Sequence, residues 1–129
     1  RVQHAARANG GVLHTFDIEP RKHEVASKHF ARAGLDDVIT LHTGDAAREL
    51  TGLDDGVDFA FLDATKHETR AYWAALEPKL ADRCLITVDN TSTHRKDLAE
   101  FLELIGQRED FTTADVPVGN GFALSVRTG

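Results

Sequence analysis

The sequence predicts an α/β fold with a mostly parallel sheet and an antiparallel hairpin at its C-terminal end. Strand-like and helix-like patterns alternate four times before the hairpin, an order typical of helices packed on a parallel sheet. The pattern at 57–63 is an almost continuous apolar run, typical of a strand that helices cover on both faces. With 129 residues, 41% of them hydrophobic, the chain is long and apolar enough for one packed core. We therefore expect residues 1–129 to form a single domain.

The first half of the chain carries clear start and stop signals for its helices. Gly10 follows one helical pattern and Gly34 follows another, and glycine commonly terminates helices. Pro20 suits the first turn of the second helix, because its fixed φ angle is helical and its missing N–H is not needed there. The predicted elements are a helix end, a strand, a helix, a strand and a short helix, at residues 1–9, 12–18, 20–33, 38–43 and 46–50.

The second half repeats the alternation and then ends in two strands. The strand at 57–63 is followed by a helix that Pro78 limits, and then by a strand at 84–89. Apolar residues at helical spacing mark the next helix: Leu98, Phe101, Leu102 and Ile105. Strands are predicted at 111–118 and 122–127. Asn120-Gly121 between them is a strong signal for a hairpin turn.

Composition and charge exclude several classes of partner. The net charge is −6 and the basic residues are scattered, so we expect neither a nucleic-acid nor a membrane partner. No apolar run approaches the roughly 20 residues that span a bilayer. The single cysteine, Cys84, lies inside an apolar strand and is predicted to pack rather than react. One cysteine without an internal partner fits a reducing, cytoplasmic location.

Polar residues stand where two of the predicted strands end. One apolar run stops at Asp63, with Lys66 three residues further on, and another stops at Asp89-Asn90. Ligands of open parallel sheets bind beyond the carboxyl ends of the strands. If the two strands are neighbours, three oxygen donors and one amine meet at one place. Carboxylate and amide oxygens suit a hard cation, so this pattern predicts a metal-assisted deprotonation site.

Six short motifs occur in an order and spacing that is specific when they are taken together. They are Thr15-Phe16-Asp17-Ile18-Glu19-Pro20, Ala33-Gly34-Leu35, Gly44-Asp45-Ala46, Phe61-Leu62-Asp63-Ala64-Thr65-Lys66, Val88-Asp89-Asn90-Thr91 and Val116-Pro117-Val118-Gly119-Asn120-Gly121. In these motifs the sequence resembles the class I S-adenosylmethionine-dependent O-methyltransferases, of the metal-dependent catechol and caffeoyl-coenzyme A type. The resemblance covers nearly the whole chain and implies a Rossmann-like methyltransferase sheet.

The resemblance implies S-adenosylmethionine as cofactor. By the family's pattern, Asp17 would hold the ribose of the cofactor, and Asp45 and Ala46 would approach its adenine. Asp63 would also lie at the cofactor site. Relatives commonly dimerise, which implies a homodimer.

The resemblance also implies how the acceptor is activated. Asp63, Asp89 and Asn90 would hold a divalent metal, with Mg²⁺ expected and Ca²⁺ or Mn²⁺ as alternatives. Lys66 would act as the base. The methyl acceptor would be a hydroxyl oxygen of a small molecule such as a catechol.

Three departures from the family's pattern stand out. The family's first strand and glycine-rich loop should lie before Arg1, so we expect the domain to be incomplete at its N-terminal side by about 50 to 90 residues. Thr65 stands where many relatives have a second aspartate. The loop between Asn90 and Leu98 is shorter than in the plant enzymes, so the substrate would be held differently.

Each site assignment has a plainer alternative. Asp89-Asn90 could form only a turn, and Lys66 could be a solvated loop lysine. Asp17, like Glu19, could serve only as a negative charge near a helix N-terminus. Asp45 could cap the following helix, a role compatible with cofactor contact.

Further alternatives concern other polar and aromatic side chains and the function itself. His94 could contact substrate, but a polar residue at a helix start is the favoured interpretation. Tyr72 and Trp73 are predicted to belong to the core rather than to a substrate-stacking wall. Two rival functions are a metal-independent methyltransferase of the same fold, and a cofactor-binding or assembly module without catalysis.

Overall fold

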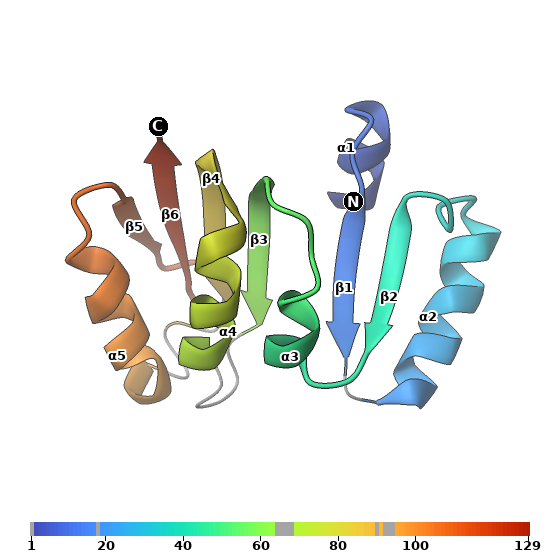
Figure 1. Ribbon diagram of the computed structural model, residues 1–129. Helices are drawn as coiled ribbons and strands as arrows, with labels where there is room; N and C mark the ends of the chain where they lie inside the picture. The colour runs from blue at the N-terminus through green and yellow to red at the C-terminus, as the bar shows by residue number, and fades with distance from the viewer. Residues whose placement is uncertain (1, 18, 64–68, 90, 92–94) are drawn as a thin grey trace. The chain divides into compact units, whose positions relative to one another are not determined.

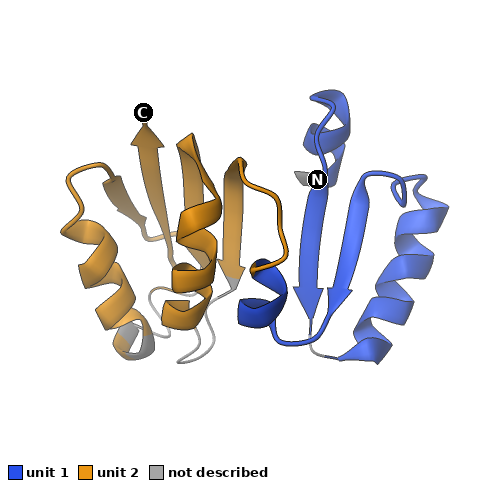
Figure 2. Cartoon of the chain, in the orientation of Figure 1, with its two compact units in different colours: residues 1–50 blue, residues 51–129 orange. Residues whose placement is uncertain are grey.

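The computed structural model describes residues 2–17, 19–63, 69–89, 91 and 95–129. These residues form two compact units, 1–50 and 51–129, which Figure 2 shows in separate colours. The expectation of a single domain stays a prediction. Among the described residues, none of the helices has the length and apolarity that crossing a bilayer requires.

The first unit is a parallel strand pair flanked by helices. Its elements are α1 (Val2–Ala8), β1 (Leu13–Asp17), α2 (Pro20–Arg32), β2 (Ile39–Thr43) and α3 (Ala46–Leu50). Both glycine stop signals are confirmed: Gly10 and Gly34 each have a φ of 68°, a conformation that glycine adopts without strain. Behind Gly34, the N–H of Leu35 closes helix α2 by donating to the carbonyl of Phe30 at 2.9 Å. The boundaries of this unit therefore follow from local sequence signals.

The second unit is a four-stranded mixed sheet with the strand order β3-β4-β6-β5 (Figure 1). Its elements are β3 (Val57–Asp63), α4 (Thr69–Leu76), a 3₁₀ turn η1 (Glu77–Lys79), β4 (Leu80–Asp89), α5 (Arg95–Gly106), β5 (Thr112–Val116) and β6 (Phe122–Thr128). Strands β3 and β4 are parallel, whereas β6 runs antiparallel to both β4 and β5. The predicted α/β class, its parallel strands and its C-terminal hairpin are confirmed.

An aromatic cluster forms part of the core of the second unit. The ring of Trp73 on α4 meets Phe101 and Phe111 edge-on, at centroid distances of 5.6 and 5.8 Å. Trp73 is buried, as predicted, whereas Tyr72 is only half-buried. Cys84 is a buried free cysteine, which confirms its packing role. Edge-to-face ring contacts of this kind contribute about 0.5–1.5 kcal/mol beyond the area they bury.

The prediction that strand 57–63 is covered on both faces is wrong for one of its faces. Phe61 is 59% exposed, although it sits in the middle of the apolar run. Side chains alternate along a strand, and the neighbours Ala60 and Leu62 pair in register with the buried Ile86 and Val88. The opposite face is thus exposed at Phe61, although Val57 and Phe59 on that face are half-buried.

The turn of the C-terminal hairpin lies where the sequence predicts it. Val116 and Phe122 are register partners, and the amide of Gly121 donates to the carbonyl of Val118 at 2.9 Å. Gly119 and Gly121 have φ values of 60° and 77°, which other residues adopt only with strain. Strand β5 ends at Val116 rather than at the predicted residue 118, and the next residue, Pro117, has no N–H for the ladder.

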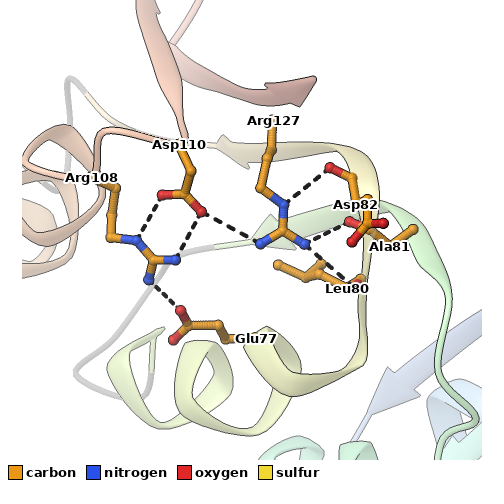
Figure 3. A network of polar contacts seen from close by, with 7 residues as sticks. All are labelled: Glu77, Leu80, Ala81, Asp82, Arg108, Asp110 and Arg127. Carbon is orange, nitrogen blue, oxygen red and sulfur yellow. Dashed lines mark hydrogen bonds and ion pairs between the residues drawn. The ribbon is translucent and has the colours of Figure 1, made fainter. Parts of the chain in front are cut away.

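A network of arginines and carboxylates ties the ends of several elements together (Figure 3). Asp110 accepts hydrogen bonds from Nε and Nη2 of Arg108 at 2.9 and 3.0 Å, and Arg108 also pairs with Glu77. Arg127 lies 3.6 Å from the same Asp110 carboxylate and donates to the carbonyl of Ala81 at 2.6 Å. The network joins η1, the start of β4, the segment after α5 and the end of β6. Strand β4 begins at Leu80, four residues before the predicted apolar strand, and Leu80 is the register partner of Val57.

Candidate functional site

The ends of β1 and β2 bring the predicted cofactor residues of the first unit together. Asp17 and Thr43, the last residues of the two strands, are register partners. The amide of Gly44 then donates to the main-chain carbonyl of Asp17 at 3.0 Å. Because the strands are parallel and end level with each other, Asp17 lies beside the turn that carries Asp45. This arrangement places two of the predicted cofactor residues at one edge of the strand pair.

The side chain of Asp17 also shapes the turn into α2. Its Oδ1 accepts a hydrogen bond from the amide of Glu19 at 2.9 Å, and the residue is half-buried. This contact belongs to the plainer alternative, a carboxylate near a helix start. An ionised carboxylate offers about four acceptor positions, so one such bond leaves room for ribose hydroxyls. The two roles of Asp17 are therefore compatible.

Asp45 caps helix α3, as its alternative interpretation predicted. Its Oδ1 accepts from the amide of Ala47 at 3.2 Å, and its main-chain carbonyl accepts from the amide of Glu49 at 2.9 Å. Ala46 is the first residue of the helix. Gly44, just before the cap, has a φ of 139°, which disfavours any other residue at this turn. The turn is thus fixed by a glycine and by a capping carboxylate.

The ends of β3 and β4 meet in the second unit. Asp63 and Asp89, their last residues, are register partners, so the two strands are neighbours as the site hypothesis required. Asn90, Lys66 and His94 lie outside the described residues. The structure therefore places the main chains of two of the three predicted metal ligands side by side, and the metal-binding and base roles stay predictions.

Thr91 holds the chain that follows this strand end, and the sequence analysis assigned it no role. Its side chain is fully buried, and its hydroxyl lies 3.3 Å from Oδ1 of Asp115 on β5. Its amide donates to the carbonyl of Gly121 in the hairpin turn at 3.1 Å. The only sequence signal was that both Thr91 and Gly121 belong to the motifs of the family resemblance.

The donor chemistry at the ends of β3 and β4 suits a hard divalent cation, since both strands end in an aspartate. Within the part of the chain that the structure describes, no group of three or more His, Cys, Asp or Glu residues is placed to hold a metal ion. The third predicted ligand is an amide, Asn90, which lies outside that part. Two observations are therefore in favour of a metal site: both residues are aspartates, and they are register partners.

In open α/β sheets, ligands bind beyond the carboxyl ends of the strands, and the parallel strands β1, β3 and β4 of this chain each end in an aspartate. The sequence profile described as methyltransferase domain matches residues 1–91 of this chain. The chain therefore belongs to the methyltransferase domain family. This membership confirms the methyltransferase fold that the six sequence motifs predict.

Individual relatives agree with this assignment. A Mycobacterium ulcerans protein with the provisional name O-methyltransferase is 32% identical over 139 aligned residues, which cover 93% of this chain and 60% of that protein. A methyltransferase crystal structure from Geobacter sulfurreducens shares 28% identity at a TM-score of 0.79, covering 91% of this chain and 58% of the other. The O-methyltransferase TomG of Streptomyces achromogenes, solved in complex with S-adenosylmethionine, shares 26% identity at a TM-score of 0.83 and covers 92% and 63%. This chain thus spans about 60% of the length of the relatives it matches.

Proposed function

We propose that the protein transfers a methyl group from S-adenosylmethionine to a hydroxyl oxygen of a small, catechol-like acceptor, with the help of a divalent metal. The observation that carries the proposal is the junction at Asp17 and Gly44, in a chain that belongs to the methyltransferase domain family. A carboxylate at such a strand end is a recurring partner of ribose hydroxyls. The similar protein TomG was solved with S-adenosylmethionine, which supports the choice of cofactor.

In this proposal the first unit binds the adenosine part of the cofactor. Asp17 accepts hydrogen bonds from the ribose hydroxyls, while its Oδ1 keeps the turn to Glu19 in place. The turn of Asp45 and Ala46 lies against the adenine, and the cap on helix α3 fixes its shape. Both groups are held by main-chain hydrogen bonds before any ligand binds, which lowers the entropy cost of binding.

The strand ends of the second unit serve the acceptor. Asp63, Asp89 and Asn90 supply oxygen ligands for the metal, and Lys66 takes the proton of the acceptor hydroxyl. A bound divalent cation lowers the pKa of a coordinated hydroxyl and fixes its position. Lys66 can act as base where burial or nearby positive charge lowers its pKa. Placing oxygen, methyl carbon and sulfur in line supplies much of the remaining rate enhancement.

The test measures S-adenosylhomocysteine binding by calorimetry and methyl transfer to a panel of catechols with Mg²⁺. Asp89→Asn removes one carboxylate from the strand end, and Asp82→Asn on the same strand is the matched control. We expect Asp89→Asn and chelation each to abolish turnover, and Asp82→Asn to leave it unchanged.

The other outcomes identify the rival functions. Turnover that survives both chelation and Asp89→Asn would show a metal-independent methyltransferase. Binding of S-adenosylhomocysteine without methylation of any acceptor would indicate a non-catalytic module. No binding at all would refute the proposed function.

A further inference from the structure

His23 is a buried histidine whose contact reaches the edge of the strand pair. It lies on helix α2, about one turn after Pro20, and is only 8% exposed. Its Nδ1 lies 2.5 Å from the hydroxyl oxygen of Thr43. Histidine is otherwise a residue of intermediate burial, and His29 on the same helix is exposed. The contact with Thr43 is therefore the feature that distinguishes His23.

Thr43 occupies a position that decides the geometry of the proposed cofactor site. It is the last residue of β2, the register partner of Asp17, and the residue before Gly44. Thr43 itself is exposed, so without His23 its hydroxyl would exchange hydrogen bonds with water. The buried imidazole instead gives the end of β2 a fixed partner on α2. Helix α2, β2 and β1 are thereby joined at one point.

The other ring nitrogen shows that this histidine is not optimised for stability. Nε2 of His23 is the buried side-chain nitrogen or oxygen that lacks a hydrogen-bond partner among the described residues. Either neutral tautomer leaves Nε2 unpaired, because Nδ1 is engaged by Thr43 as donor or as acceptor. A buried polar atom without a partner destabilises the fold, whereas leucine at this position would not. Burial of apolar surface alone does not explain a histidine at this position, so its contact with Thr43 is the feature to account for.

We propose that His23 is a positioning residue of the cofactor site: it holds Thr43, and through it the turn at Gly44 and Asp45 beside Asp17. The inference rests on the proposed function, because the ligand that the turn receives is the adenosine part of S-adenosylmethionine. His23 itself contacts no cofactor in this scheme. It acts by fixing the main chain on which Asp45 and Ala46 are carried.

Substitutions at His23 can distinguish the roles of its two ring nitrogens. Asn carries its amide near the place of Nδ1 and can still bond Thr43, whereas Gln carries its amide near the place of Nε2. His23→Leu removes both polar atoms and fills the space. The control is His29→Leu, at the exposed histidine of the same helix.

We expect His23→Leu to weaken the binding of S-adenosylhomocysteine about five- to tenfold, which corresponds to the usual contribution of one hydrogen bond. His23→Asn should restore binding to within about twofold, and His23→Gln should not. Thr43→Val should weaken binding as His23→Leu does, and the double variant should lose little more, because both changes break the same contact.

His23→Leu should unfold at a temperature no lower than the wild type, since the unpaired nitrogen is gone. Reduced affinity would then not reflect unfolding.

A second measurement needs no ligand. Hydrogen exchange at the Gly44 amide, which bonds the carbonyl of Asp17, should be faster in His23→Leu and in Thr43→Val than in the wild type or His29→Leu. Unchanged Gly44 exchange, or wild-type affinity in a folded His23→Leu, would overturn the positioning role. One further result would separate the two proposals. If the wild type binds no S-adenosylhomocysteine, while Gly44 exchange is still faster in the variants, the proposed function is refuted and the positioning of the turn by His23 stands.

Discussion

The main-chain amide of Gly44 donates a hydrogen bond to the main-chain carbonyl of Asp17 over 3.0 Å. This bond continues the ladder of β1 and β2 one step beyond the register pair of Asp17 and Thr43. This main-chain bond helps to hold the two proposed adenosine contacts, Asp17 and Asp45, at one edge. Side-chain substitutions can test their chemistry while this main-chain frame stays in place.

Asp17→Asn should weaken S-adenosylhomocysteine binding by about 10- to 100-fold, because a hydrogen bond to a charged group contributes about 1.5–3 kcal/mol. The fold should change little, since the asparagine Oδ1 can still accept from the amide of Glu19. Calorimetric affinities together with urea unfolding would separate the two effects.

Glu19→Gln is the control for this change. It removes a carboxylate at the same helix start without touching the proposed ribose ligand. If Asp17 served only as a charge near helix α2, both variants would lose similar, small amounts of stability and neither would lose affinity.

Gly44→Ala should destabilise the protein by about 1–3 kcal/mol, the usual cost of a residue forced into an unfavourable backbone conformation. The φ of Gly44 is 139°, and an added Cβ would lie 3.3 Å from Oε1 of Glu49. Gly106→Ala is the matched control, because Gly106 ends helix α5 and a Cβ there meets open space. Urea unfolding should show a lower midpoint for Gly44→Ala and an equal or higher one for Gly106→Ala. Equal midpoints for Gly44→Ala and the wild type would contradict the strained turn.

Much of this fold could be predicted because its signals are local. Gly34 stops a helix by its own conformation, and Asp63 marks the end of an apolar run wherever the strand lies. The pairing of Asp63 with Asp89 required the strand order, which spacing along the chain does not encode. The exposure of Phe61 was missed because an apolar run alone does not tell one covered face from two.

The positioning contacts of the site could not be read from the sequence for a related reason. His23 and Thr91 are polar residues that the pattern of apolar residues does not predict to be buried, and each has a hydrogen-bond partner far along the chain. Thr43 lies 20 residues from His23, and Asp115 lies 24 residues from Thr91. Only the three-dimensional fold brings such partners together.

The contribution of Asp110 to stability should disappear in acid. The hydrogen bonds from Arg108 hold the pKa of the Asp110 carboxyl below its usual value. A carboxyl with a lowered pKa in the folded state stabilises the protein above its unfolded pKa, and this contribution is lost as the pH falls through the folded pKa. Asp110→Asn should therefore lower the melting temperature above about pH 5, and the difference from the wild type should shrink below about pH 4. Glu109→Gln removes the neighbouring exposed carboxylate and leaves the contacts of Asp110 with Arg108 in place, so it is the control for the change in net charge.

Cys84 should resist alkylation in the folded protein. The thiol lies within β4 and is 5% exposed, and burial raises its pKa, an effect that the nearby Arg127 partly opposes. Since the thiolate is the reactive form, both burial and the raised pKa slow attack on iodoacetamide. Mass spectrometry after treatment at about pH 8, near the pKa of a free cysteine, should find little modified protein without urea and complete modification in urea. Modification at the rate of a free thiol in the absence of urea would contradict the packing role of Cys84. Because this is the only cysteine of the chain, a single added mass reports its state without ambiguity.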